Sequence, residues 1–272
     1  MAPPFLLAQA VRLPGRSAYE RLYYRLACWL LGVRLRCLGA VHRGRAVLYV
    51  SNHVSYLDIP VIGALTRATF VAKSEIANWP LVGFMSRMRG TAFVRRNSSD
   101  AVLQRTQLAA RLENGESLIL FPEGTSTSGR SVLPFKSALF ASLYPGRDAQ
   151  PIADVQPVTL AYSGDAHGVP LSDTDRDLFA WYGDDELVPH LWSLLGRRGV
   201  TVDVVFHAPI LPAEAEHRKV LARRCEAMVA GVLTEVLSGQ YPVTSDEPRS
   251  LPTDQSQRGK RRLLSLVRRR RA

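Results

Sequence analysis

The sequence contains few cysteines, and none is placed for a disulfide framework or a metal site. The three residues, Cys28, Cys37 and Cys225, are odd in number and far apart, and no Cys-x-x-Cys pair is present. A disulfide-rich scaffold and a structural zinc site are therefore not indicated. Cysteines of this kind are typical of a protein in a reducing compartment.

Long apolar runs are also missing. A membrane-spanning helix needs about 20 apolar residues, whereas the longest candidate, residues 26–33, is bounded by Arg25 and Arg34. Residues 1–10 have no basic segment ahead of their apolar stretch, and no signal-peptide cleavage site follows. We therefore expect neither a spanning helix nor a secretory signal.

Several catalytic motifs are absent as well. The sequence has no GxxxxGK[ST] loop, no GxGxxG after a strand, no HExxH and no GxSxG. Phosphate-loop, dinucleotide-binding and zinc-protease sites, and the serine-hydrolase elbow, are thus not predicted.

Acidic residues are scarce at the two ends of the chain, and the positive charge gathers there. Residues 1–50 hold eight Arg and one acid, and residues 258–272 hold seven Arg, one Lys and no acid. Because the whole chain carries +11, the middle carries −4. A nucleic-acid enzyme would place its basic groove in the body of the fold, so we expect an anionic membrane surface, and not nucleic acid, as the partner.

The composition divides the chain into three regions. Residues 1–44 predict an N-terminal amphipathic helical segment, because residues 19–38 mix Arg, Leu, Trp and Tyr at near-helical spacing. This segment suits a membrane interface, and packing on its own domain is an equal alternative. Residues 45–240 predict the folded domain. Residues 241–272 predict a polar linker and a basic tail, which is either a solvated end or a short amphipathic helix on anionic lipid.

Between these ends, strands and helices alternate. This alternation predicts an α/β fold: a single domain with a mixed, largely parallel sheet and helices on both faces. Strands are expected at residues 46–51, 69–73, 91–95, 117–121, 155–162 and 200–207, and helices at 79–88, 98–113, 137–143 and 213–237.

A histidine and an aspartate five residues apart, His53 and Asp58, follow the first of these strands. On one continuous helix they would lie about 140° apart, so they meet only if the chain turns between them. We expect His53 at the strand end and Asp58 as the cap of a helix with Pro60 in its first turn. The carboxylate would then orient the imidazole as a general base. A purely structural histidine is the alternative.

Two further strand ends carry charged residues. Glu123, in Phe-Pro-Glu-Gly-Thr, directly follows the apolar strand at 117–121, where open α/β sheets place ligands. Arg95 and Arg96 close the strand at 91–95, and a guanidinium there suits a phosphate. A tight turn and a solvated strand end are the alternatives.

Taken together, these motifs resemble the glycerolipid acyltransferase family, in particular bacterial 1-acyl-glycerol-3-phosphate acyltransferases. The resemblance covers roughly residues 45–165 and rests on four blocks in the family's order. The blocks are His53-x4-Asp58; Gly90, Phe93 and Arg96; Phe121-Pro122-Glu123-Gly124-Thr125; and Val155-Gln156-Pro157-Val158.

The resemblance implies an acyl transfer in phospholipid biosynthesis. His53 would take the proton from a lysolipid hydroxyl that attacks an acyl thioester, and Asp58 would orient His53. Acyl-CoA or acyl carrier protein would be the donor, with no cofactor and no metal. The acceptor-binding residues that the resemblance implies are Arg96, Glu123, Gly124 and Thr125.

The sequence departs from the family at two positions. Ser126 stands where the family commonly has Arg, so Arg130 or Lys136 would supply the cation, and Ala138 stands where Gly is frequent. The acceptor that the resemblance favours is 1-acyl-glycerol-3-phosphate, giving phosphatidic acid, and these departures keep lyso-ornithine lipid or another lysolipid open as the alternative.

Other predictions concern the protein's surroundings. A lipid hydrolase and a non-catalytic lipid-binding module are further alternatives to an acyltransferase. We expect the enzyme on the cytoplasmic face of the inner membrane, with an apolar acyl groove leading from His53. Trp181, Tyr182 and Trp192 are expected to pack in the core or along that groove.

Overall fold

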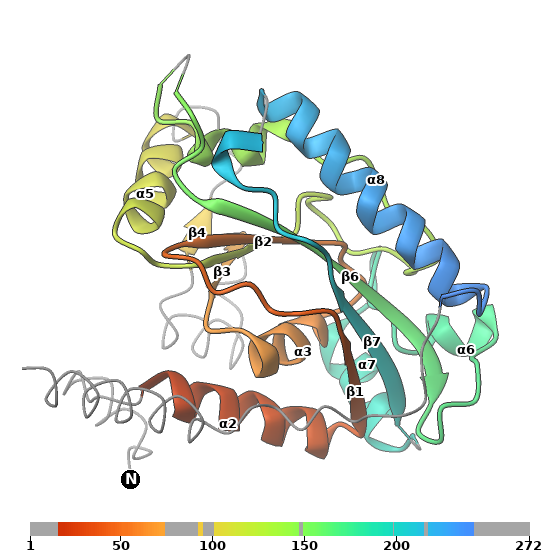
Figure 1. Cartoon of the computed structure of the whole chain (residues 1–272). Helices are drawn as coiled ribbons and strands as arrows, with labels where there is room; N and C mark the ends of the chain where they lie inside the picture. Colours follow the sequence, from red (N-terminus) through yellow and green to blue (C-terminus); the bar gives the residue numbers. More distant parts are fainter. Residues whose placement is uncertain are drawn as a thin grey trace, which may run out of the picture. The chain divides into compact units, whose positions relative to one another are not determined.

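Seven strands form one sheet in the order β1-β7-β6-β2-β5-β3-β4 (Figure 1). This computed structural model describes residues 16–73, 92–94, 101–146, 149–197, 199–214 and 217–241. Only β6 and β7 pair antiparallel, and the other neighbours pair parallel. The expected mixed, largely parallel sheet is confirmed. The strands are β1 Val33–Leu38, β2 Val47–Ser51, β3 Thr69–Lys73, β4 Ala92–Val94, β5 Leu118–Leu120, β6 Asp154–Asp165 and β7 Val200–Phe206.

Helices cover both faces of this sheet, as expected (Figure 1). On one face α2, α3 and α7 share an apolar cluster with the sheet, and on the other α5, α8 and the 3-10 helix η3 share a second. The inner strands β2 and β7 are buried along their whole length, as strands covered on both faces must be. The helices are α2 Arg16–Leu30, α3 Asp58–Leu65, α5 Ala101–Glu113, η3 Ser137–Leu143, α6 Asp173–Asp177, α7 Leu187–Leu195, η4 Pro212–Glu214 and α8 Arg218–Leu237.

Helix α2 has apolar residues on two faces. Its inner face packs Tyr24 against Gly63 of α3, where a Cβ would come within 2.1 Å of Tyr24 Cε2. The outer face is exposed over two turns, at positions spaced i, i+4, i+7 and i+8. Its residues are Leu22, Leu26, Trp29 and Leu30. None of the helices that the structure describes is long and apolar enough to cross a bilayer.

The prediction that residues 19–38 form one helical segment is wrong in its second half. Helix α2 ends at Leu30, the chain turns at Gly32 (φ 66°), and β1 begins at Val33. Residues 33–37 alternate apolar and charged residues with a period of two, which is the period of a strand. Because β1 pairs with β7, the boundary expected at residue 44 cuts through the sheet.

Three other elements differ from expectation. Helix α8 begins at Arg218 and not at 213, because the short 3-10 helix η4 occupies 212–214. Helices α6 and α7 were not predicted. Trp192 lies on the outer side of α7 and is 78% exposed, so it is not a core residue. The helix expected at 79–88 and the linker and tail after Tyr241 lie outside the described residues.

Candidate active site

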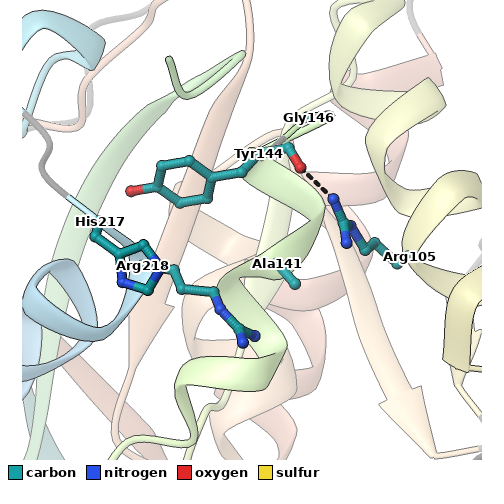
Figure 2. A pocket seen from close by; sticks show the side chains of 6 residues that line it. All are labelled: Arg105, Ala141, Tyr144, Gly146, His217 and Arg218. Carbon is teal, nitrogen blue, oxygen red and sulfur yellow. Dashed lines mark hydrogen bonds between the residues drawn. The ribbon is translucent and has the colours of Figure 1, made fainter. Parts of the chain in front are cut away.

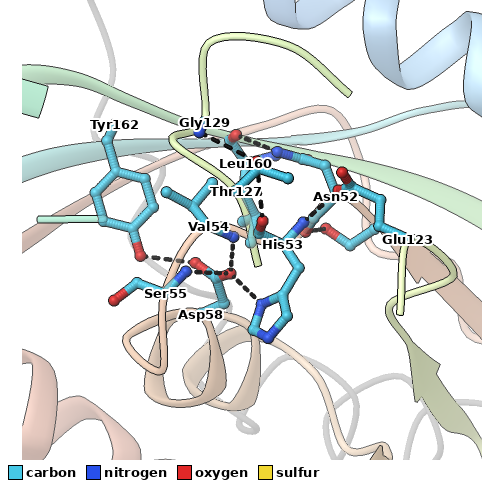
Figure 3. Close-up of polar contacts among 11 residues, drawn as sticks. Asn52, His53, Val54, Ser55, Asp58, Glu123, Thr127, Gly129, Leu160 and Tyr162 are labelled. Atoms are coloured by element: carbon cyan, nitrogen blue, oxygen red, sulfur yellow. Dashed lines mark hydrogen bonds and ion pairs between the residues drawn. The ribbon is translucent and has the colours of Figure 1, made fainter. Parts of the chain in front are cut away.

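The first motif lies where β2 leaves the sheet. Asn52 Nδ2 donates to the carbonyl oxygen of Leu160 at 2.9 Å, and Asn52 Oδ1 accepts the Leu160 amide at 2.8 Å. The Asn52 side chain thus pairs with the backbone of Leu160 on β6 as a residue of a neighbouring strand would. This bridge fixes the start of the His53 loop at the carboxyl end of β2 (Figure 3).

The chain turns after His53 and brings its ring to Asp58, the first residue of α3. His53 Nδ1 lies 2.7 Å from Asp58 Oδ2, and the same oxygen accepts the amides of Val54 at 2.7 Å and Ser55 at 3.1 Å. The expected contact between the two side chains is therefore present. The expected helix cap is not, because the carboxylate reaches back to the preceding turn and not to the first amides of α3.

This contact decides which imidazole nitrogen can act as a base. A carboxylate accepts hydrogen bonds, so Nδ1 carries the hydrogen and Nε2 keeps its lone pair. No residue that the structure describes is bonded to Nε2, and the His53 side chain is 21% exposed whereas Asp58 is fully buried. The ring stacks on Phe121 with centroids 4.2 Å apart. His53 is thus held in place with one nitrogen available.

Glu123 contacts the same loop through its backbone. Its Oε1 accepts the His53 amide and its Oε2 accepts the Leu133 amide, each at 2.8 Å. Burial raises the pKa of Glu123 to about 7, against the two amide hydrogen bonds, which lower it. Both oxygens are already bonded to the main chain. The carboxylate therefore holds two loops together, and the direct contact with the acceptor that the sequence predicts stays a prediction.

A threonine that the motifs did not single out completes this support. Thr127 donates to the His53 carbonyl oxygen from its amide at 2.9 Å and from Oγ1 at 3.3 Å. Gly129, with φ 73°, packs directly against Val54. The main chain of His53 is thus fixed at both its N–H and its C=O. No sequence signal separates Thr127 from an ordinary polar turn residue.

The predicted site has two cations within the described residues, Arg130 and Lys136, and Lys136 is the better placed. Its Nζ lies 2.5 Å from the point that a Cβ at Gly124 would occupy, and Gly124 has φ 72°. Lys136 has no ion-pair partner within the described ranges, and the neighbouring Thr125 is exposed. Lys136 therefore presents its ammonium group beside the Glu-Gly-Thr turn.

Arg130 is occupied elsewhere. Its guanidinium pairs with Asp177 and lies 3.9 Å from Asp173, both on α6. Two carboxylates thus lie beside its charge, and a contact of Arg130 with the acceptor stays a prediction. Arg96, the third cation of the predicted set, lies outside the described residues.

Tyr162, on β6, is the other residue that sequence reasoning missed. Its hydroxyl donates to Asp58 Oδ1 at 2.7 Å, in a fully buried position (Figure 3). It stands four residues beyond the last motif block, and nothing in the strand pattern marks a tyrosine there as anything but core.

A separate pocket of about 350 Å³ lies between α5, η3 and the start of α8 (Figure 2). Tyr144 and Gly146 in its wall precede β6, whereas His53 follows the end of β2, a parallel neighbour of β6. The pocket thus lies toward the amino end of β6, whereas His53 lies at the carboxyl end of β2. It is not the expected acyl groove, which stays a prediction. Its lining comprises Arg105, Ala141, Tyr144, Gly146, His217 and Arg218.

Across the described ranges, no three His, Cys, Asp or Glu side chains gather as a metal would require.

Known proteins are similar to this chain in sequence and in fold. A family model described as Acyltransferase matches residues 33–159. The lyso-ornithine lipid O-acyltransferase of Brucella abortus (strain 2308) is 38% identical over 221 residues, which are 80% of this chain and 82% of that protein. The chain belongs to the acyltransferase family.

A second relative of this acyltransferase carries a different name. The 1-acyl-sn-glycerol-3-phosphate acyltransferase of Neisseria gonorrhoeae is 34% identical over 70% of each chain. The crystal structure of the 1-acyl-sn-glycerophosphate acyltransferase from Thermotoga maritima matches with a TM-score of 0.57 at 23% identity, over 81% of this chain and 79% of that one, which shows a common fold. The family match begins at Val33, the first residue of β1, so β1 belongs to the acyltransferase domain.

Proposed function

We propose that this acyltransferase moves a fatty acyl group from a thioester to the hydroxyl of a lysolipid, with His53 as the general base. The contact between His53 Nδ1 and Asp58 Oδ2, at 2.7 Å, carries the proposal. It leaves Nε2 able to accept a proton. The names of both relatives, which describe O-acylation of a lysolipid, support the same reaction class.

The reaction balances without a covalent enzyme intermediate. Nε2 of His53 takes the proton of the acceptor hydroxyl as that oxygen attacks the thioester carbonyl carbon. The new C–O bond forms, the C–S bond breaks, and the imidazolium returns its proton to the departing thiolate. Asp58 orients the ring and stabilises the transient positive charge, as a carboxylate does in a catalytic triad. The products are an acylated lipid and a free thiol.

For the acceptor, we propose lyso-ornithine lipid. The Brucella relative and the one from Pseudomonas aeruginosa, each 38% identical over 80% of this chain, are named for this substrate. The site offers little for a phosphate at the third motif, since Ser126 replaces a cation and Arg130 is paired with acids on α6. An acceptor without a terminal phosphate suits such a site.

A second candidate acceptor is 1-acyl-glycerol-3-phosphate. Lys136 favours it, because an ammonium group beside Gly124 is a suitable contact for a phosphate. The Neisseria relative is named for this substrate.

The deciding experiment is a matrix of two acceptors and two donors. Purified enzyme is mixed with one radiolabelled donor, either acyl-CoA or acyl carrier protein that carries the acyl group. The acceptor is lyso-ornithine lipid or 1-acyl-glycerol-3-phosphate at equal surface concentration in mixed micelles. We expect the label in ornithine lipid, with kcat/KM for that acceptor at least about tenfold above the other. Preferential label in phosphatidic acid would reverse the choice of acceptor.

The same experiment separates the alternative classes. Free labelled fatty acid in place of a diacyl product would indicate a hydrolase that uses water as the acceptor. Recovery of unchanged donor in every combination, from protein that binds the lipids, would indicate a non-catalytic lipid-binding module.

We further propose that the enzyme works on the surface of a membrane, at the cytoplasmic face of the inner membrane. The outer apolar stripe of α2 is one support: Trp29 is 73% exposed and Arg25 lies next to the stripe. Helices that rest in a membrane interface combine such a stripe with flanking cations. Trp192 on α7, on the same face of the sheet, presents a second exposed apolar side chain. The basic ends of the chain suit an anionic leaflet.

A further inference from the structure

The carboxylate of Asp58 is completely buried and receives four hydrogen bonds. Three of them end on Oδ2 and come from residues 53–55, within its own turn. The fourth ends on Oδ1 and comes from Tyr162, which is 104 residues away in the sequence. Among the residues that the structure describes, Oδ1 therefore has a single donor, and that donor belongs to a different layer of the fold (Figure 3).

Tyr162 is itself held firmly on β6. The pairing register between β6 and β7 shifts directly after it, between Tyr162 and Gly164, and such irregularities re-aim side chains next to functional sites. The carbonyl oxygen of Tyr162 accepts a hydrogen bond from Arg176 Nε at 3.0 Å, and Arg176 is 5% exposed. Both the backbone and the ring of Tyr162 are thus fixed.

A phenylalanine would fill the same buried space, so the hydroxyl needs a reason. A buried hydroxyl is costly unless it is hydrogen-bonded, and its acceptor here is Asp58 Oδ1. Burial, followed by the negative charge of Asp58, raises the pKa of Tyr162 well above its usual range. The phenol therefore stays protonated and remains a donor at every pH at which the enzyme works.

We propose that Tyr162 is a positioning residue for acyl transfer, which fixes the Asp58 carboxylate and, through it, the orientation and proton affinity of the His53 imidazole. This inference rests on the proposed function of His53 as the base. A hydrogen bond to one oxygen of a carboxylate withdraws negative charge from the other. Tyr162 thus weakens the attraction of Asp58 for a protonated His53.

The other groups that face this network are few among the described residues. Asp58 and Glu123 face His53, the latter through its amide. Cys28 of α2 and Tyr56 of the turn before α3 lie close enough to Tyr162 to influence it. Burial raises the pKa of both the Cys28 thiol and the Tyr56 phenol. They therefore stay neutral across the working range, which leaves Asp58 as the charge that Tyr162 modifies.

The test is Tyr162→Phe, which deletes one oxygen and keeps the ring. Without its donor, Asp58 favours imidazolium more strongly, so the acid limb of the kcat/KM–pH profile should move to higher pH by at least about half a unit. That shift is a roughly threefold change in proton affinity. Because the carboxylate is less firmly oriented, kcat should also fall by about tenfold, with KM for donor and acceptor within about twofold of wild type.

A matched control is Tyr49→Phe. Tyr49 is also a buried tyrosine, and its hydroxyl donates to the His42 carbonyl oxygen at 2.6 Å, with no contact to Asp58. Both variants should lose similar stability in urea unfolding. Only Tyr162→Phe should move the pH profile, whereas an equal shift in both variants, or in neither, would overturn the proposal.

A second replacement changes the donor strength without removing it. Tyr162 replaced alone by 3-fluorotyrosine carries a more acidic phenol, a stronger donor, and should move the acid limb to lower pH. An unmoved limb in this protein would also contradict the inference, even where Tyr162→Phe folds poorly. Failure of wild-type enzyme to transfer acyl groups to any lysolipid would instead refute the proposed function, so the two failures are distinguishable.

Discussion

The backbone amide of His53 donates to Oε1 of Glu123 at 2.8 Å. This bond joins two loops that follow the neighbouring parallel strands β2 and β5. The His53 block and the Glu123 block, 70 residues apart, therefore meet through the main chain of the proposed base. Glu123 also bonds to the Leu133 amide, so one buried carboxylate sets the separation of three backbone segments.

Replacing His53 with Ala should reduce acyl transfer at least about 100-fold, since general bases contribute roughly 10²–10⁴-fold. Transfer of labelled acyl groups to lysolipid measures the effect, and circular dichroism checks the fold. The matched control is His42→Ala, because His42 also pairs with an aspartate, Asp154, at 2.7 Å. That variant should keep near wild-type transfer. More than about a tenth of the activity remaining in His53→Ala would contradict the role of base.

Glu123→Gln should lower both stability and activity. The amide NH2 cannot accept a hydrogen bond, so either the His53 or the Leu133 amide loses its acceptor in a buried site. We expect the free energy of unfolding to fall by about 1–3 kcal/mol and kcat to fall about tenfold. Glu116→Gln is the control, since Glu116 is 40% exposed in its pair with Arg111 and should cost less than about 1 kcal/mol. Equal effects of the two variants in urea unfolding would refute the positioning role of Glu123.

Acid should destabilise the fold through His207. Burial lowers the pKa of His207 to about 4 from an ordinary value of 6.5, so the unfolded chain binds more protons between these values. The free energy of unfolding should therefore fall as the pH drops from about 6.5 to about 4. In His207→Gln, which keeps a donor and acceptor near Thr159, this part of the loss should vanish. Urea unfolding of both proteins across the window measures it.

The difference between the two proteins isolates His207 from Glu123. The raised pKa of Glu123 has the opposite sign: its contribution is present at low pH and is lost as the pH rises toward about 7. Glu123 is unchanged in His207→Gln, so its contribution cancels in the comparison. Parallel stability curves for wild type and His207→Gln would show that His207 does not titrate as proposed.

Trp29→Ala should weaken binding to vesicles. Trp29 is 73% exposed on the outer face of α2, so its removal costs the fold little and deletes an aromatic anchor at the proposed interface. We expect at least about a fivefold rise in the partition Kd for anionic vesicles, measured by co-sedimentation. The control is Val102→Ala, on α5 and 74% exposed, on the other face of the sheet. Identical partitioning of the two variants would exclude α2 as the contact.

Removal of residues 258–272 should also weaken binding to anionic vesicles, at low salt only. The segment carries seven Arg and one Lys, and each cation near such a surface contributes roughly 1 kcal/mol. The effect should disappear on neutral vesicles and shrink as salt screens the charges. Unchanged co-sedimentation of the truncated enzyme at low salt would dismiss the tail as a membrane contact.

The sequence predicted the sheet better than the site. The apolar run at residues 118–120 predicted a strand covered on both faces. Residues 200–206 predicted a strand by their alternation of apolar and polar residues, although Thr201 and Asp203 are also buried. The contact of His53 with Asp58 was also predictable, since the charged pair spans a strand end and a helix start. The switch from α2 to β1 was missed because an Arg-containing strand also fits a helical pattern over six residues.

The supports of the site were not predictable. Tyr162 and Thr127 touch Asp58 and His53 across more than 70 residues of sequence, and neither residue type is unusual at its position. The place of Glu123 after a buried strand predicted a contact with the acceptor, which stays a prediction, whereas its two bonds to the main chain emerge only from the structure. A spacing rule identifies residues that meet within one turn, whereas these contacts depend on how the layers stack.

The packing of Tyr24 on Gly63 couples helix α2 to helix α3. With no side chain at Gly63, α2 rests directly on α3, the helix that begins with Asp58. If α2 lies among the phospholipid headgroups, the depth of α2 in the membrane therefore also determines the height of His53 above the bilayer.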